Sequence, residues 1–161
     1  MDIYKQVEKE IALKHGAVAD KTRKSIGDFL LNNNAKQPVN VKSNNLAGKN
    51  YSPNIISAMK LIRWLQQEGN ELYFIFADYY VTDGKLEIVK DTGPIAIQNI
   101  RWNCLSIEAQ GWGVIQKCKP LELDMKQDLK GFLRGMKEAY ETYMAKEAKK
   151  VEIIKAMIKD F

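Results

Sequence analysis

The chain contains the stretch Gly27-Asp28-Phe29-Leu30-Leu31, a polar turn, and then Pro38-Val39-Asn40-Val41-Lys42-Ser43-Asn44-Asn45. The first run is mainly apolar, and the second alternates β-branched with polar side chains, which is typical of two strands joined as a hairpin. Alternate side chains of a strand share one face, so Asn40 and Lys42 lie on the same side. We therefore expect Asp28, Asn40 and Lys42 to converge at one edge of a sheet.

The composition is that of an ordinary soluble globular protein, and we expect a single domain over residues 1–161. The 161 residues are 45% hydrophobic and 28% charged, and the apolar runs are shorter than the about 20 residues that span a membrane. Two cysteines and an N-terminus without an apolar signal core indicate a cytoplasmic protein with no membrane association. The formal net charge of +5 favours a polyanionic partner such as nucleic acid.

The spacing of apolar residues predicts an α/β (α+β) fold, with one mixed central sheet flanked by helices. The predicted helices are Asp2–Lys14, Pro53–Gln67 and a long C-terminal segment over 124–161 that is interrupted near Gly131 or Gly135. The predicted strands are Phe29–Leu31, the run that starts at Pro38, Leu72–Ala77, Leu86–Val89, Ala96–Ile97, Cys104–Ile107 and Gly113–Gln116. Residues 43–52 are predicted to form a polar loop, and Asp83-Gly84 a tight turn.

The inventory of reactive side chains restricts the chemistry. With His15 as the single histidine, the chain lacks the ligands of a Cys/His zinc site and is poorly suited to histidine-dependent nucleophilic catalysis. Hydrolysis would have to depend on carboxylates, lysine and a metal ion, with no organic cofactor. Mg²⁺ held by carboxylate and carbonyl oxygens can activate water and stabilise charge on a phosphate. Asp28, the Val41 carbonyl and Lys42 supply those groups, although they also fit an ordinary surface hairpin.

The order of aspartate, apolar strand, turn and a strand carrying lysine resembles the PD-(D/E)xK nuclease superfamily, especially its small Type II restriction endonucleases. The likeness covers about residues 20–80, where a polar loop, Pro53-Asn54-Ile55-Ile56-Ser57 and the apolar strand Leu72–Ala77 follow the lysine. It implies a restriction-endonuclease-like fold and Mg²⁺-dependent cleavage of double-stranded DNA at a short sequence, as in restriction–modification. Mn²⁺ would substitute for Mg²⁺.

The resemblance also implies a role for each residue of the hairpin. Asp28 would bind the metal and contact the scissile phosphate, Asn40 and the Val41 carbonyl would be further ligands, and Lys42 would orient the attacking water. The chain departs from the family pattern at two positions. Gly27 stands where a proline is usual, and Asn40 stands where an acid is usual, which removes one negative charge from the metal site.

A carboxylate from another element would compensate for the missing acid. Glu8 or Glu10 on the first helix is the expected donor, because related nucleases often bring an acid from that helix; Asp20 and Glu71 are poorer candidates. The asparagine leaves two alternatives open. One is a DNA-binding protein that does not cut, and the other is a structure-selective DNA repair or resolvase nuclease.

The polar loop that follows Lys42 is the expected DNA-facing segment. Asparagine can pair with adenine, lysine can contact guanine or phosphate, and tyrosine can reach phosphate or stack on a base. The predicted DNA contacts are Ser43, Asn44, Asn45, Lys49, Asn50, Tyr51 and Asn54. Cutting both strands of a palindrome requires two active sites, so the resemblance also implies a homodimer, with the C-terminal segment or the N-terminal helix as its interface.

Overall fold

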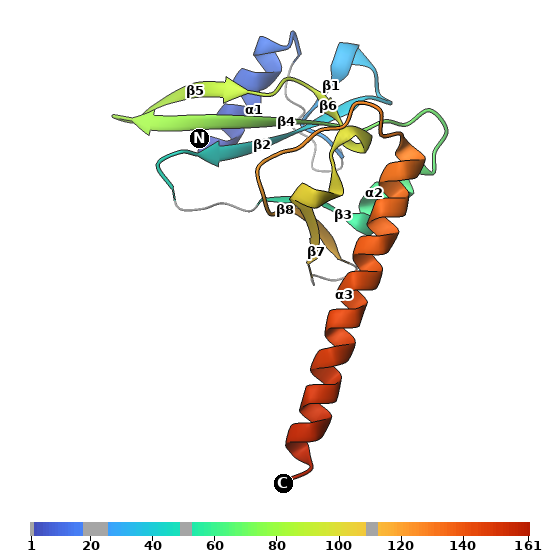
Figure 1. Cartoon of the computed structure of the whole chain (residues 1–161). Helices are drawn as coiled ribbons and strands as arrows, with labels where there is room; N and C mark the ends of the chain where they lie inside the picture. The colour runs from blue at the N-terminus through green and yellow to red at the C-terminus, as the bar shows by residue number, and fades with distance from the viewer. Residues whose placement is uncertain (1, 18–25, 49–52, 109–112) are drawn as a thin grey trace. The chain divides into compact units, whose positions relative to one another are not determined.

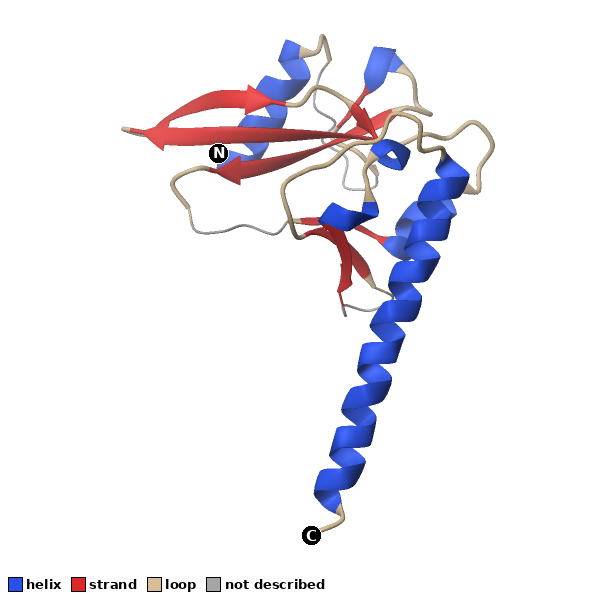
Figure 2. Ribbon diagram, in the orientation of Figure 1, coloured by secondary structure: helices blue, strands red, loops and turns tan. Residues whose placement is uncertain are grey.

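The computed structural model describes residues 2–17, 26–48, 53–108 and 113–161 and has an α+β fold (Figures 1 and 2). It contains a mixed five-stranded sheet, a three-stranded antiparallel sheet and three α-helices. The chain forms two compact units, one of Met1–Pro53 with Met59–Ile97 and one of Asn54–Ala58 with Gln98–Phe161. The expectation of a single domain over residues 1–161 stays a prediction.

The five-stranded sheet belongs to the first unit and follows the order β1-β2-β4-β5, with β6 also paired to β4. Its strands are β1 (Phe29–Leu30), β2 (Pro38–Asn45), β4 (Tyr73–Thr82), β5 (Lys85–Asp91) and β6 (Ile95–Ala96). β1 and β2 are antiparallel, as the predicted hairpin requires, whereas β2 and β4 are parallel. The predicted turn at Asp83-Gly84 is confirmed, since both residues have positive φ and connect β4 to β5.

Helix α1 (Ile3–Lys14) confirms the predicted N-terminal helix, and the Asp2 carboxylate caps it by accepting a hydrogen bond from the Tyr4 N–H. It lies against β2 and β5 (Figure 1). Its buried residues and the inward residues of the strands form one core cluster, which comprises Val7, Ile11, Ala12, Phe29, Val39, Val41, Ile75, Ala77 and Tyr79. Because Val39 and Val41 point into this core, Asn40 and Lys42 point to the opposite face of β2.

Two predictions about residues 43–57 are wrong. The strand continues through Ser43–Asn45, which the sequence places in a loop, because the long neighbouring strand β4 offers pairing partners as far as Tyr79. The helix expected from Pro53 begins only at Ala58, as α2 (Ala58–Leu65). The intervening residues form strand β3 (Asn54–Ser57), with Ile55 and Ile56 buried.

The second unit contains the three-stranded sheet, in the order β3-β8-β7, and the C-terminal helix. Strands β7 (Leu105–Glu108) and β8 (Val114–Lys117) form an antiparallel pair close to their predicted positions. Three 3₁₀ turns complete the fold, namely η1 (Leu31–Asn33), η2 (Ile97–Asn99) and η3 (Trp102–Cys104). Among the described residues, no helix combines the length and the apolar composition that crossing a membrane requires.

Helix α3 (Leu129–Ile158) runs without interruption through the two glycines at which the sequence predicts a break. It is capped by Asp128, whose side chain accepts a hydrogen bond from the Gly131 N–H. Gly135 serves close packing instead, because a Cβ there would collide with the ring of Trp102. That ring also packs at a tilt against the ring of Phe132 and donates a hydrogen bond to the Phe132 carbonyl. The glycine therefore positions the helix on η3 rather than ending it.

Candidate functional site

The acidic residue of the hairpin lies where β1 begins. The Asp28 N–H donates to the Val39 carbonyl, at 2.7 Å, and one oxygen of the Asp28 carboxylate accepts from the Val41 N–H, at 2.6 Å. A Cβ at Gly27 would lie only 2.8 to 2.9 Å from atoms of Pro38 and Val39. The chain at residue 27 approaches β2 too closely for any residue larger than glycine.

Lys42 lies on β2 two residues beyond Asn40, with its side chain partly buried. Burial lowers the pKa of its ammonium group, while the carboxylates of Asp28 and Glu8 act in the opposite direction. Burial likewise raises the pKa of Asp28, against the hydrogen bond from Val41 and the positive charge of Lys42. The hairpin thus places the Asp28 carboxylate and the Lys42 ammonium group near enough for each to shift the pKa of the other.

Glu8 is the third member of this cluster and comes from α1. Burial and the neighbouring Asp28 raise its pKa to about 7, and Lys42 partly offsets that rise. Glu10 is exposed instead, and it is not among the groups that shift the pKa of Asp28 or Lys42. Two residues along a helix are separated by about 200°, so only one of the two glutamates can face this site. The structure brings Glu8 to the site and leaves Glu10 away from it.

Lys60 on α2 is a fourth charged group at the site, and the sequence gives no reason to single it out. It lowers the pKa of both Asp28 and Lys42, which requires its ammonium group to be near both. Its side chain is exposed. Helical spacing places Lys60 on a polar face of the predicted helix, but only the fold reveals that this face points toward Asp28. We use the name charged cluster for Glu8, Asp28, Lys42 and Lys60.

Two uncharged oxygens, Asn40 Oδ1 and the Val41 carbonyl oxygen, belong to residues that neighbour Asp28. The amide nitrogen of Asn40 donates to the Ile26 carbonyl, at 3.3 Å, which leaves the amide oxygen Oδ1 as the group that could bind a cation. The N–H and C=O of a strand residue point to the same edge, so the Val41 carbonyl points toward β1, as its N–H does. The Val41 carbonyl therefore points to the edge of β2 at which the Asp28 carboxylate is bound.

The residues predicted to contact DNA do not all lie at the charged cluster. Asn44 donates to the Asp78 carboxylate on the neighbouring strand, at 3.1 Å, and Asn45 accepts from the Ala47 N–H in a local turn. Ser43 is partly buried on β2. Asn54 accepts from Gln116 on β8, and it belongs to the second unit, not to the unit that holds the charged cluster. Lys49, Asn50 and Tyr51 lie outside the described residues.

The two poorer candidates for the missing acid do not join the charged cluster. Glu71 accepts hydrogen bonds from Gln37 and from the Tyr73 hydroxyl, and these occupy its carboxylate elsewhere in the first unit. Asp20 lies outside the described residues. Glu8 is therefore the acid that the fold supplies to the hairpin.

The oxygen atoms near Asp28 are of the kind that bind a divalent cation. Within the described parts of the chain, no three His, Cys, Asp or Glu side chains gather as a metal-binding group. Glu8 and Asp28 nevertheless provide two carboxylates, and Asn40 and Val41 add neutral oxygens. Mg²⁺ is commonly held by one or two carboxylates together with water, so these all-oxygen donors fit Mg²⁺ or Mn²⁺. Burial is the main cause of the raised pKa of Glu8, and the nearby Asp28 carboxylate adds to it; a bound cation would offset that second contribution.

Comparison with known proteins adds no further constraint. The sequence matches no protein-family model, and a search of curated proteins finds no match.

Proposed function

We propose that this chain is a Mg²⁺-dependent endonuclease that hydrolyses phosphodiester bonds of double-stranded DNA, of the Type II restriction kind, on a restriction-endonuclease-like fold. The observation that supports the proposal most directly is the electrostatic coupling of Glu8, Asp28 and Lys42. They come from a helix and two adjacent strands. Two acids and an amine in one partly buried place are the groups that metal-assisted phosphodiester cleavage needs.

The acids and the neutral oxygens have the role of holding the cation. Asp28 and Glu8 would supply the charge, and Asn40 Oδ1 and the Val41 carbonyl would complete the protein ligands. When bound, the cation supplies positive charge at the scissile phosphate and acidifies the attacking water. The hydrogen bond from the Val41 N–H fixes the orientation of the Asp28 carboxylate, so that this ligand is already positioned before a cation arrives.

The two lysines would act on the substrate. Lys42 donates a hydrogen bond to the attacking water and orients it, and its lowered pKa makes it a better proton acceptor than an exposed lysine. Lys60 is exposed and adds a second positive charge near Asp28, where it would bind a phosphate oxygen. Together they offset the negative charge that accumulates on the reacting phosphate.

One residue favours an alternative. Asn40 leaves the site with one charge fewer than the family pattern, which would suit a DNA-binding protein that holds a cation weakly and does not cut. Cleavage confined to branched DNA would instead indicate a structure-selective repair or resolvase nuclease. These alternatives and the restriction enzyme differ in the products they give from defined DNA substrates.

The test is incubation of the purified protein with plasmid DNA and with branched DNA, in the presence of Mg²⁺ or Mn²⁺. Discrete plasmid fragments support the proposal, and a gel shift without cleavage supports the non-cutting binder. Asp28→Ala and Lys42→Ala should each abolish cleavage while DNA binding remains. Glu8→Gln should reduce it strongly, whereas Glu10→Gln, the same change on the exposed face of α1, should not. Near-normal cleavage by Asp28→Ala or Lys42→Ala would refute the assignment.

A further inference from the structure

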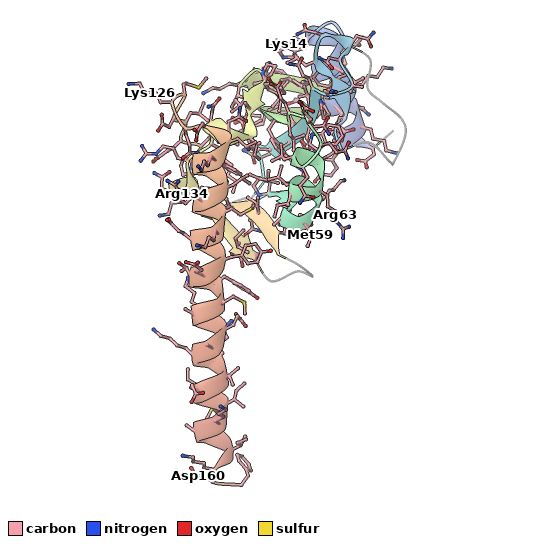
Figure 3. All side chains as sticks on the ribbon, turned by 90° about the vertical axis from the view of Figure 1, so that its right-hand side faces the viewer. Lys14, Met59, Arg63, Lys126, Arg134 and Asp160 are labelled. Carbon is pink, nitrogen blue, oxygen red and sulfur yellow. The ribbon has the colours of Figure 1, made fainter. Side chains whose placement is uncertain are left out.

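The last turns of α3 carry a row of large apolar side chains that are exposed. Val151 is 50% exposed, Ile154 56%, Ile158 59% and Met144 59%. These positions recur at helical spacing along one face of α3, whose side chains Figure 3 draws as far as Asp160. Further exposed apolar side chains of the same turns are Ile153, Met157 and Phe161.

The same face is buried nearer the start of the helix. Phe132 is fully buried and Met136 is 4% exposed, because both pack within the second unit. Counting 100° per residue, Met136 lies on the same side of α3 as Ile154, eighteen residues further along. The unit covers only the first part of a continuous apolar face. The remaining part, from Met144 to Ile158, is about 21 Å long.

The charges on this segment indicate what covers it. Two residues at equal distances before and after Val151 are called counterparts here. Lys150 and Glu152 are counterparts of opposite charge, and so are Glu147 and Lys155. Apolar residues of the exposed face follow the same symmetry, whereas Ile153, on the other side of the helix, has Lys149 as its counterpart. Met144 corresponds to Ile158, and Ala148 corresponds to Ile154. From Glu141 to Phe161 no such pair brings together two like charges.

This arrangement suits two copies of α3 that run antiparallel. In a symmetric antiparallel pair centred on Val151, each residue meets its counterpart from the other copy. Glu147 is then level with Lys155 of the second copy, and Met144 with Ile158. A parallel pair in register would instead place every charged residue beside its own copy, which is repulsive at Glu147, Lys150 and Lys155. A self-complementary pattern of this kind selects a second copy of the chain over an unrelated partner.

The buried face of α1, the other predicted interface segment, packs within the first unit. The buried residues of α1, Val7, Ile11 and Ala12, belong to the core of the first unit and have no contact to offer a second chain.

We propose that the chain forms a symmetric homodimer in which the C-terminal turns of α3, Met144 to Ile158, pack antiparallel about a two-fold axis near Val151. The apolar residues form the centre of the contact. The pairs of Glu147 with Lys155 of the second copy set the orientation. This inference stands on α3 alone and does not depend on the proposed nuclease function, so a dimer without cleavage would leave it intact.

The first experiment measures the oligomeric state of the full chain by sedimentation equilibrium. The wild type should be a dimer, and Ile154→Asp should weaken dimerisation by about tenfold or more, because it places a charge in the apolar centre. Ala156→Asp is the matched control, since Ala156 lies well away from Ile154 around the same turns. A monomeric wild type, or equal loss in both variants, would overturn the proposal.

The second experiment tests the orientation by exchanging charges. Glu147→Lys and Lys155→Glu should each weaken the dimer several-fold, and the double variant should recover most of that loss. Within one helix, Glu147 pairs with Lys150 and Glu152 with Lys155. The double variant makes both of these intrahelical pairs repulsive, so its recovery can come only from contacts between copies. A double variant weaker than either single variant would contradict the antiparallel pairing.

A cysteine cross-link gives an independent geometric check under mild oxidation by oxidised glutathione. Val151→Cys should form a covalent dimer readily, because the two copies of residue 151 meet at the two-fold axis. Met144→Cys should not, because the two copies of residue 144 are about 21 Å apart along the helix axis in this arrangement. The wild type, which retains Cys104 and Cys118, is the control. Equal cross-linking at both positions would indicate a parallel pair and overturn the proposal.

Discussion

The Glu8 carboxyl group loses its proton near neutral pH because of where α1 places it. Burial and the adjacent Asp28 raise its pKa from 4.5 to about 7, although Lys42 acts against the rise. The pKa in the folded chain therefore exceeds the pKa in the unfolded chain. As pH increases from 4.5 to 7, the unfolded state loses its proton first, and the free energy of unfolding falls.

We predict that Glu8→Gln removes this pH dependence. The variant should equal the wild type at acidic pH and be more stable above pH 7, by about 1 kcal/mol once solvent screening is considered. Urea denaturation over the titration range measures the effect, and Glu10→Gln, on the exposed face of α1, is the control. Mg²⁺ should stabilise the wild type above pH 7 more than it stabilises Glu8→Gln, because a bound cation relieves the repulsion. An unchanged slope in Glu8→Gln would contradict the assignment.

The sequence predicts that some members of the charged cluster lie at the site and does not decide this for others, and each case has a physical reason. Asp28 and Lys42 could be brought together because a hairpin with alternating side chains fixes which residues share an edge. Glu8 and Glu10 lie about 200° apart on α1, and the sequence alone does not show which side of this helix faces Asp28. Lys60 could not be found, since its proximity to Asp28 depends on how α2 packs within the first unit.

At the scale of elements, the turn between β1 and β2 maintains the register that the charged cluster needs. Asn32 and Asn33 both have positive φ, 52° and 54°, a conformation that asparagine and glycine tolerate and β-branched residues do not. We predict that Asn33→Val destabilises the chain by about 1 to 2 kcal/mol, while Asn33→Gly is nearly neutral. Thermal unfolding of the two variants side by side decides this, and equal loss in both would indicate that the asparagine side chain matters instead.

A second prediction at this scale concerns α3. Alanine is a better helix former than glycine by about 1 kcal/mol, so Gly135→Ala would be stabilising if the helix alone mattered. Because a Cβ there collides with Trp102, we expect a loss of about 1 to 3 kcal/mol. Gly131→Ala, which meets only the side chains of Gln127 and Asp128, should change stability less. Denaturant midpoints compare the two, and a stable Gly135→Ala would show that Trp102 can move aside.

The elements that the sequence predicted incorrectly are those decided by distant partners. Residues 54–57 precede a helical pattern, but β8, about sixty residues later, supplies a strand partner that buries Ile55 and Ile56. Likewise the polar residues Ser43–Asn45 resemble a loop until β4 is known to extend beside them. Elements whose signals are local, such as α1 and the turn at Asp83-Gly84, were predicted correctly.

At the scale of the whole molecule, the formal net charge of +5 is consistent with the proposed binding of DNA, and that binding should weaken as the salt concentration rises. Each phosphate contacted by lysine or arginine contributes a slope of about −0.9 to the dependence of log affinity on log salt concentration. We expect affinity for duplex DNA to fall steeply between about 50 and 200 mM salt. Fluorescence anisotropy with labelled duplex, measured without Mg²⁺ to prevent cleavage, gives the slope. A flat response would rule out a phosphate-binding surface.

The place of β2 between β1 and β4 has a consequence for hydrogen–deuterium exchange. Around Lys42 the partner strand is β4, because β1 pairs only with Pro38 and Val39. Amides that bond to β4 are released only when these two strands separate, so they should be among the slowest to exchange. The amine is consequently presented by a part of the chain that hardly fluctuates. A ligand that reaches it need not immobilise the backbone, and this lowers the entropy lost on binding.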